Sequence, residues 1–298
     1  MKTRHGPDGI HLFDRTTGLN LLVDEVAVAQ KHWATAPRQV SIALTNACDL
    51  ACPFCYAPKH SATLPHSDLL KWVRELDEGG CLGVGFGGGE PTLYRRLPEL
   101  CAFVSEHTQM AVTMTTHGHR WTQQLVEALA GSVNFVRVSV DGTETIYERF
   151  RGRAFADLRE RVQLISDAFP VGINCVINET TVSDLPRLAA LAADVNAAQL
   201  LLLPERPVAG RPGIGPDARS EMETWIRSYT GPVPLALGEG DAADLPIAEP
   251  LPLETGLRAY AHVDASGTAK RSSFSSRGQA IGPTGILDAI ARLEGEAA

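Results

Sequence analysis

The sequence predicts an α/β fold: a partial, TIM-like (β/α)6 barrel with a short N-terminal β-hairpin and a C-terminal α+β extension. From residue 40 onward, short β-branched or apolar runs alternate with glycine-rich or polar loops and with amphipathic segments, which is typical of consecutive βα units around a parallel sheet. The polar, glycine-rich segments all follow predicted strands. Because right-handed crossovers gather these loops at one face of a barrel, we expect the functional site at that face.

The six predicted barrel strands are short apolar runs. They are Val40–Thr45, Leu82–Phe86, Met110–Thr115, Phe135–Val140, Val171–Ile177 and Gln199–Leu203. Between them, apolar residues recur at helical spacing, as in Leu69, Val73 and Leu76, in Leu97, Leu100, Cys101 and Val104, and in Leu188, Leu191, Ala192 and Val195. Ser183 is the predicted N-cap of the last of these helices.

The length of 298 residues favours one large domain with appendages over two equal domains. Residues 1–37 form the predicted N-terminal extension, with two short strands around the turn Arg15–Gly18. Residues 38–207 form the barrel, and residues 208–298 the C-terminal extension. The extension is expected to contain a helix, a hairpin and a closing helix, marked respectively by Met222, Trp225, Ile226 and Tyr229, by Asp264–Gly267, and by Ile286, Leu287, Ile290 and Leu293.

The charge pattern excludes two classes of partner. A formal net charge of −8 without a dense Lys/Arg block lacks the electrostatic footprint of a nucleic-acid binder or of an anionic-membrane binder. The first residues lack the apolar core of a secretory signal, and the longest apolar runs are too short to span a bilayer. The sequence therefore predicts a cytoplasmic protein with a peptide or small-molecule partner.

Three of the six cysteines are crowded into the pattern C-x3-C-x2-C at Cys48, Cys52 and Cys55. Zinc needs four ligands in a closed tetrahedron, and His60 is a candidate for the fourth. A disulfide leaves one thiol unpaired and suits an oxidising compartment. An iron–sulfur cube held by three thiolates leaves one iron free to bind a substrate or cosubstrate. The spacing alone leaves zinc and the iron–sulfur cluster open.

A glycine-rich segment follows the second strand. Gly87 to Gly89 are expected to let bare backbone approach a ligand, and Glu90 to supply an anionic acceptor for an ammonium group. A G-x-G-x-x-G match at Gly83, Gly85 and Gly88 is weak, because its first two glycines fall inside the strand. The alternative is an ordinary flexible strand-to-helix loop.

Taken together, these segments resemble the radical S-adenosylmethionine (radical SAM) superfamily. The matching residues are Cys48, Cys52 and Cys55 with aromatic Phe54 and Tyr56 beside the last cysteine, then Gly88-Gly89-Glu90-Pro91, then Ser139-Val140-Asp141-Gly142. The resemblance covers Val40 to about Pro207. It implies that the three cysteines hold a [4Fe-4S] cluster whose fourth iron is chelated by the amino and carboxylate groups of S-adenosylmethionine.

The resemblance also implies which residues bind S-adenosylmethionine. Gly88, Gly89 and Glu90 would receive the methionine amino group, and the Tyr56 backbone would border the adenine. Ser139 and Asp141 would approach the ribose or the methionine end. Arg151 is a candidate partner for the carboxylate.

The C-terminal stretch bears a fainter likeness to the SPASM/twitch extension of many peptide-modifying members of the superfamily. It has the hairpin with an Asp-x-x-Gly turn at Asp264–Gly267. That extension normally carries cysteines for auxiliary clusters, and no cysteine follows Cys175 in this chain. An auxiliary cluster is therefore expected to be absent.

For each of two pairs of polar residues in or after the strands, two interpretations stay open. His117 and His119 either contact substrate or S-adenosylmethionine, or are merely solvated. Asn174 and Asn178 share one face of the fifth strand, where cosubstrate contact and structural capping stay open.

The function expected from the resemblance is reductive cleavage of S-adenosylmethionine to a 5′-deoxyadenosyl radical, which abstracts hydrogen from a C–H bond of a peptide or protein side chain. The alternative is the same chemistry on a small metabolite such as a sugar, nucleoside or amino acid. A reducing partner such as flavodoxin or ferredoxin is expected to supply the electron. A rival from another class is a non-catalytic zinc-binding module, but zinc explains neither the glycine-rich segment nor Ser139-Val140-Asp141-Gly142.

Overall fold

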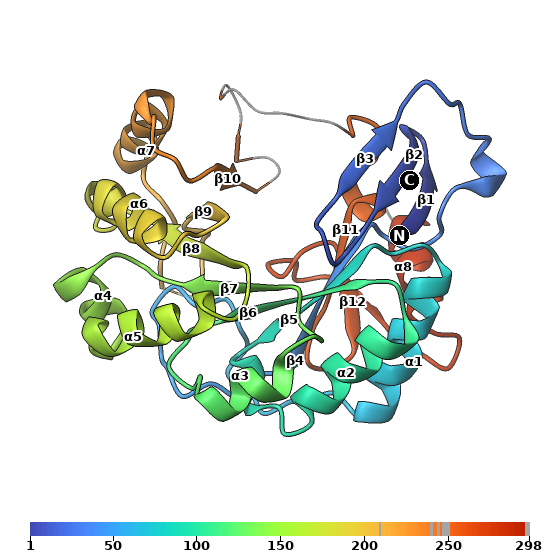
Figure 1. Cartoon of the computed structure of the whole chain (residues 1–298), viewed down its shortest axis with the longest axis horizontal. Helices are drawn as coiled ribbons and strands as arrows, with labels where there is room; N and C mark the ends of the chain where they lie inside the picture. Colours follow the sequence, from blue (N-terminus) through green and yellow to red (C-terminus); the bar gives the residue numbers. More distant parts are fainter. Residues whose placement is uncertain (209, 239–240, 243–244, 246–250, 296–298) are drawn as a thin grey trace.

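A ten-stranded sheet, in the order β10-β9-β8-β7-β6-β5-β4-β11-β12-β13, forms the centre of the protein (Figure 1). The computed structural model describes residues 1–208, 210–238, 241–242, 245 and 251–295. The six predicted barrel strands are all present. They are β4 Gln39–Thr45, β5 Gly83–Gly88, β6 Ala111–Thr116, β7 Phe135–Ser139, β8 Val171–Ile177 and β9 Gln199–Pro204. Each pairs in parallel with the next, so their carboxyl ends meet at one edge of the sheet.

Helices connect these strands and cover one face of the sheet (Figure 1). They are α1 His66–Glu78, α2 Leu97–His107, α3 Gln123–Leu129, α4 Glu144–Arg151, α5 Phe155–Ser166 and α6 Leu185–Asp194, with the short 3-10 helices η2 Pro91–Leu93 and η3 Val182–Asp184. The predicted apolar helix positions are buried in the core. The predicted N-cap was wrong: Ser183 lies inside η3, and Asp184 occupies the N-cap of α6. The Asp184 carboxylate instead accepts hydrogen bonds from Thr143.

Alternation along the strands separates the two faces of the sheet. On β7, Val136 and Val138 are fully buried, whereas Phe135, Arg137 and Ser139 are half-buried. Successive side chains of a strand point to opposite faces, so the valines face the helices and the other three face the inside of the barrel. We call this second surface the inner face.

The N-terminal extension is a three-stranded antiparallel sheet rather than a hairpin. The predicted hairpin is β2 Gly9–Phe13 and β3 Asn20–Val23, and β1 Lys2–Gly6 pairs with β2 as a further strand. A 3-10 helix, η1 Gln30–His32, follows. The sequence did not predict β1 because the residues on its buried side include Lys2 and Arg4, so the strand lacks an apolar face.

The C-terminal segment adds strands to both edges of the barrel sheet. After α7 Pro216–Ser228, β10 Leu235–Leu237 pairs in parallel with β9. A 3-10 helix, η4 Gly256–Arg258, leads to β11 Tyr260–Val263, which pairs in parallel with β4. The hairpin continues with β12 Thr268–Lys270 and β13 Gln279–Ala280, and α8 Ile286–Gly295 packs against it and against α1.

The predicted hairpin turn is present between β11 and β12. The Asp264 side chain accepts hydrogen bonds from the backbone N–H groups of Ser266 and Thr268, at 2.9 and 3.1 Å. A short acceptor side chain at the start of a turn commonly stabilises it in this way.

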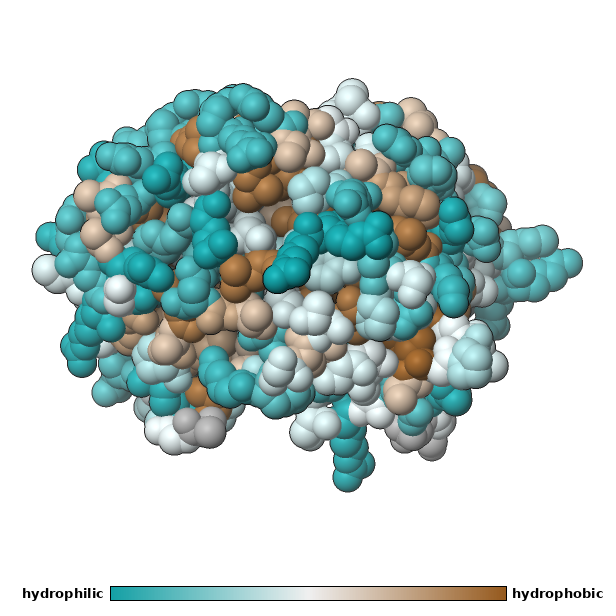
Figure 2. Space-filling view, turned by 90° about the horizontal axis from the view of Figure 1, so that it is seen from below, coloured by the Kyte–Doolittle hydropathy of each residue, from teal (hydrophilic) through white to brown (hydrophobic). Residues whose placement is uncertain are grey.

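The surface seen from below in Figure 2 presents hydrophobic residues in separate areas among hydrophilic ones, as expected of an ordinary folded surface. In the described part of the chain, no helix has both the length and the apolar character that a membrane span requires.

A buried ion pair joins the N-terminal sheet to the C-terminal segment. Arg4 of β1 donates from Nε to Glu254 Oε1 at 2.6 Å, and both side chains are almost fully buried. Arg4 also donates to the backbone oxygens of Ala36 and Gly80. Its guanidinium therefore joins the N-terminal sheet, the barrel and the C-terminal segment.

We expect Glu254→Gln to lower the free energy of unfolding by about 3 kcal/mol, because it leaves a buried arginine without its counter-charge. Urea denaturation measures this change. Glu99→Gln is the matched control, since Glu99 pairs with Arg96 on the exposed surface and such pairs contribute little. Equal losses in the two variants would contradict the role given to the buried pair.

Candidate active site

The three clustered cysteines lie in a loop that leaves the carboxyl end of β4. Cys48 is exposed, Cys52 and Cys55 are half-buried, and all three are free thiols. The base of the loop is closed by a bridge between Thr45 and Thr63 and by a 3.0 Å hydrogen bond from the Asn46 N–H to the Ala62 oxygen. The thiols are therefore held at the edge of the sheet where the strands end.

The donor atoms of the three cysteines are not gathered as they would be around a single zinc ion. Four ligands at about 2.3 Å from zinc bring their sulfur atoms within about 4 Å of one another. Within the described residues, the one set of three His, Cys, Asp or Glu ligand atoms lying within 4.8 Å of one another is Cys48, Asp49 and His117, so the three thiols are more widely spaced. The suggested fourth ligand, His60, instead lies 3.4 Å from Ser266 Oγ.

The glycine-rich segment packs against the cysteine loop. The Gly89 N–H donates to the Thr45 oxygen at 2.7 Å, and the Glu90 N–H donates to the Ala47 oxygen at 2.8 Å. A Cβ atom on Gly88 would lie 2.3 Å from the Thr45 oxygen, and one on Gly89 would lie 2.2 Å from the Ala47 oxygen. Bare backbone at these two positions is therefore required for the loop to dock, and the binding of S-adenosylmethionine by them stays a prediction.

The Glu90 side chain is fully buried and stabilises the site through hydrogen bonds. Its carboxylate accepts hydrogen bonds from Thr92 N and Oγ1, from Thr116 Oγ1 at 2.7 Å and from His117 N at 2.9 Å. These donors come from the segments after β5 and at the end of β6. The carboxylate thus joins two strand ends, and its predicted contact with an ammonium group stays untested.

His117 connects the Glu90 carboxylate to the cysteine loop. It is 4% exposed, so the interpretation of His117 as a solvated loop residue was wrong. Its Nδ1 accepts from the His119 N–H at 3.1 Å, and its Nε2 lies 2.9 Å from Asp49 Oδ1. Because Nδ1 accepts, the hydrogen bond to Asp49 is donated by Nε2.

The neighbouring His119 is held in its neutral form. Its Nε2 lies 2.7 Å from the Tyr147 hydroxyl. Burial lowers the pKa of His119 to about 4.

Asp141 and Arg151 form a buried ion pair beside the cysteine loop. Arg151 Nε donates to Asp141 Oδ2 at 2.6 Å, and the Val176 N–H donates to Asp141 Oδ1 at 2.7 Å. The guanidinium lies over the Phe54 ring, 5.8 Å from its centroid. Burial raises the pKa of the Cys52 thiol, and the positive charge of Arg151 opposes that rise. Arg151 is thus placed to act on the loop electrostatically.

The other predicted binding residues lie around the same edge. Ser139 ends β7 and is paired in register with Asn174 of β8. Tyr56 is 40% exposed, and its ring packs against that of Phe274 with centroids 4.9 Å apart. Tyr56 therefore contacts the C-terminal segment, while the adenine contact expected of its backbone stays a prediction.

Asn174 and Asn178 have different surroundings. Asn174 Oδ1 accepts from Arg137 at 3.3 Å on the inner face. Asn178 Oδ1 accepts from the N–H groups of Thr180 and Thr181 at 2.9 and 3.1 Å, which is the capping alternative. The sequence did not single out Asp49 or Arg137. The one signal for Arg137 was a charged residue between two valines of a strand.

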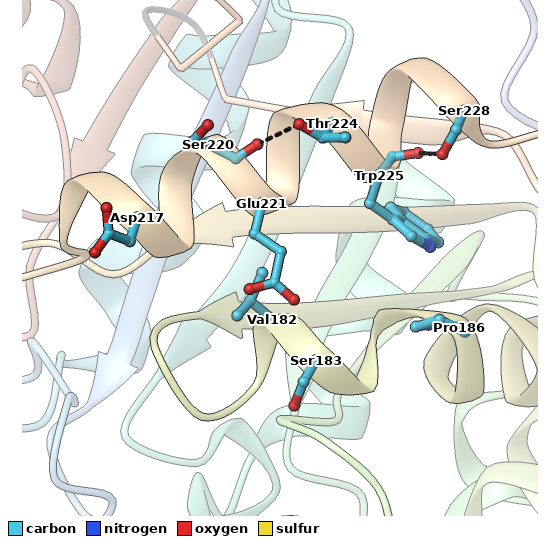
Figure 3. A pocket seen from close by; sticks show the side chains of 9 residues that line it. All are labelled: Val182, Ser183, Pro186, Asp217, Ser220, Glu221, Thr224, Trp225 and Ser228. Carbon is cyan, nitrogen blue, oxygen red and sulfur yellow. Dashed lines mark hydrogen bonds between the residues drawn. The ribbon is translucent and has the colours of Figure 1, made fainter.

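A pocket of about 570 Å³ lies between η3, α6 and α7, away from these residues (Figure 3). Figure 3 shows Trp225 and Glu221 of α7 pointing toward Val182 and Pro186. None of the residues that line it belongs to the predicted site. The chemistry of the strand ends, rather than the size of this pocket, therefore locates the candidate active site.

Comparison with protein families decides the class. The model of the radical SAM superfamily matches residues 42–192, just over half of the chain. The chain belongs to the radical SAM superfamily. Enzymes of this superfamily use a [4Fe-4S] cluster and S-adenosylmethionine, so the predicted family, enzyme class and cofactors are confirmed.

Two curated relatives resemble this radical SAM chain over the barrel region. The sporulation killing factor maturation protein SkfB of Bacillus subtilis is 29% identical over 198 residues, which cover 63% of this chain and 47% of SkfB. The Fe-coproporphyrin III synthase of Methanosarcina barkeri is 31% identical over 153 residues, which cover 49% of this chain and 38% of the synthase. The matched segments thus span less than half of each relative.

A solved structure has the same fold over most of the chain. The crystal structure of Streptococcus suis SuiB bound to precursor peptide SuiA has a TM-score of 0.75 at 15% identity and covers 96% of this chain and 86% of SuiB. This likeness confirms the predicted α/β partial-barrel class.

The residues at the strand ends fit the cofactors of the superfamily. Three free thiols, spaced more widely than around one metal ion, would hold the [4Fe-4S] cluster through Cys48, Cys52 and Cys55. When bound, the cluster supplies the electron for the cleavage of S-adenosylmethionine. The chain itself holds the loop in place through the backbone of Gly88 and Gly89 and through the buried carboxylate of Glu90.

We expect Gly89→Ala to displace the cysteine loop, because its Cβ would overlap the Ala47 oxygen. Gly87→Ala is the matched control, since a Cβ at Gly87 meets nothing within 4 Å. Hydrogen exchange of the amides of residues 45–56, measured in the apoprotein, should be faster in Gly89→Ala alone. Iron bound after anaerobic reconstitution should fall in the same variant. Equal exchange rates in both variants would contradict the docking of the loop on Gly89.

Proposed function

We propose that this protein is a radical SAM enzyme that abstracts a hydrogen atom from a C–H bond of a peptide or protein side chain. One electron and S-adenosylmethionine give methionine and a 5′-deoxyadenosyl radical, which takes the hydrogen atom and becomes 5′-deoxyadenosine. The electron would come from a low-potential flavodoxin or ferredoxin. A substrate-centred radical is left, and its fate decides the product.

One observation carries this proposal: a chain of the radical SAM superfamily has three free thiols in the loop that follows β4. The start of this loop is hydrogen-bonded to the segment that contains Gly88 and Gly89. In barrel enzymes this face builds the active site. Cys48, Cys52 and Cys55 would hold the cluster. Gly88, Gly89, Glu90, Ser139, Arg151 and the Tyr56 backbone would bind S-adenosylmethionine.

The ion pair of Asp141 and Arg151 supports a particular division of roles. The Asp141 carboxylate already accepts from Arg151 and from the Val176 backbone. Asp141 would therefore position Arg151, whose guanidinium would meet the methionine carboxylate. Enclosure of Arg151 between Asp141 and Phe54 would fix its direction, which favours a preorganised contact over a flexible one.

A peptide substrate is supported by two features. SuiB, which shares the fold, is described with a precursor peptide bound. The C-terminal segment forms the hairpin predicted from the SPASM/twitch likeness, and it continues the barrel sheet at β4. The domain limits of 1–37, 38–207 and 208–298, the cytoplasmic location and the electron donor remain predictions.

A small-molecule substrate is the second candidate, and one observation favours it. The relative that is 31% identical is named a porphyrin synthase rather than a peptide-modifying enzyme. The same radical chemistry would then act on a metabolite, and the inner face would enclose it.

The test is the fate of deuterium. The anaerobically reconstituted protein, dithionite and S-adenosylmethionine are incubated with deuterated candidate peptides or with deuterated metabolites, and 5′-deoxyadenosine is analysed by mass spectrometry. Label from a peptide supports the leading proposal, and label from a metabolite alone supports the second. Formation of no 5′-deoxyadenosine by iron-loaded wild type would contradict both.

Cys52→Ala is expected to abolish 5′-deoxyadenosine formation, whereas Cys101→Ala should retain it, because Cys101 is buried in the core on α2. Metal analysis accompanies the assay. A colourless protein with one zinc per chain would support the zinc-binding module instead, and equal loss of activity in both variants would show that the ligand assignment is wrong.

A further inference from the structure

Arg137 places a cation on the inner face, where its side-chain partners are two neutral amides. Arg137 lies in the middle of β7, between the fully buried Val136 and Val138. Its guanidinium donates to Asn174 Oδ1 of β8 at 3.3 Å and to Gln199 Oε1 of β9 at 2.6 Å. Arg137 therefore joins three neighbouring parallel strands on the side away from the helices.

No carboxylate neutralises this cation within the described parts of the chain. Both of its side-chain acceptors are amide oxygens, and no Asp or Glu oxygen described by the structure lies within 4.0 Å of its nitrogens. A guanidinium carries five N–H donors, so several N–H bonds remain without a partner among these residues. Burial lowers the pKa of Arg137 to about 10, which leaves it charged at neutral pH.

Other enclosed cations of this chain are paired differently. Lys2, Arg4 and Arg151 each contact a carboxylate, those of Asp77, Glu254 and Asp141 respectively. A fully buried charge without a counter-charge is costly. Arg137 is only half-buried, so its guanidinium is open to a counter-charge from outside the chain.

The residues around Arg137 fix the direction of its side chain. The Phe135 ring lies 5.2 Å from its Cζ, and Gly172 makes space for that ring, since a Cβ there would lie 2.8 Å from Phe135 Cζ. The arginine is thus held rigidly, which lowers the cost of binding a partner.

We propose that Arg137, held by Asn174 and Gln199, binds a carboxylate of the substrate on the inner face: an acidic side chain of a peptide. The planar fork of a guanidinium matches a carboxylate. Arg137 precedes Ser139 by two residues, so it lies deeper than the strand ends that carry the cysteine loop. This depth favours the substrate over S-adenosylmethionine. The inference rests on the proposed function, because it takes the inner face as the place of the substrate.

A purely structural role is the alternative. Arg137 would then only brace β7 against β8 and β9 through its two amide partners. Such a brace needs hydrogen-bond donors but no charge, and it makes no distinction between acidic and neutral ligands. Discrimination between a carboxylate and its amide therefore separates the two roles.

The experiment measures binding by isothermal titration calorimetry on the full chain, with its cluster reconstituted anaerobically. The probes are two pentapeptides, Gly-Gly-Glu-Gly-Gly and Gly-Gly-Gln-Gly-Gly, both acetylated and amidated, so that they differ in one carboxylate. Wild type should bind the Glu peptide at least about tenfold more tightly, as expected for a charge-assisted hydrogen bond. Arg137→Gln should lose that preference, and Arg137→Lys should keep part of it.

The control is Arg187→Gln, which changes an arginine that is 74% exposed on α6 and should retain the preference. Thermal unfolding checks that each variant folds, and Arg137→Lys decides the matter if Arg137→Gln does not. Equal binding of the two peptides by wild type, or binding of neither, would overturn the proposal. Weaker binding of S-adenosylmethionine by Arg137→Gln, with the peptide preference intact, would overturn it too and assign Arg137 to the cosubstrate.

The 5′-deoxyadenosine assay keeps this inference separate from the proposed function. Loss of the peptide preference in Arg137→Gln, while wild type forms no 5′-deoxyadenosine, would leave the carboxylate site standing and reject the radical chemistry. The reverse pair of results would reject the carboxylate site alone.

Discussion

The close approach of two backbones is the constraint on which the candidate site depends. The end of β5 meets the start of the cysteine loop at Gly88 and Gly89, where any side chain would overlap the oxygens of Thr45 and Ala47. Once this contact is made, the adjacent Glu90 is buried and collects donors from the end of β6. His117 then reaches back to Asp49 in the loop. This backbone contact thereby fixes the relative positions of the ends of β4, β5 and β6, and with them the position of the cysteine loop.

The barrel was predictable because its strands and helices obey simple periodicities. All six strands were located to within two residues, since each is a short apolar run bounded by polar or glycine-rich segments. The strand β1, which precedes the barrel, was not predicted. Charged Lys2 and Arg4 occupy its buried side, where ion pairs with distant residues replace apolar contacts. The partners Asp77 and Glu254 are far away in sequence, so local patterns carry no trace of these pairs.

The site was predictable as far as its motifs reach. Sequence placed the cysteines, the glycine-rich segment and Asp141 at the ends of the first, second and fourth barrel strands, and the sheet brings those ends together. The structure adds a second reason for Gly88 and Gly89, their close approach to the Thr45–Ala47 backbone, while their contact with a ligand stays a prediction. Arg137 and Asp49 escaped notice because their significance lies in what they face across the sheet, which depends on register rather than on neighbours along the chain.

The position of β11 beside β4 has a consequence for the biosynthesis of the protein. β4 leads into the cysteine loop and lies between β5, which follows soon in the chain, and β11, whose register runs from Tyr260 opposite Gln39 to Val263 opposite Ile42. During translation β4 therefore keeps one open edge until residue 263 has left the ribosome. Open edges invite pairing with other chains. Maturation with iron would accordingly find a finished support for the loop only after β11 has been synthesised.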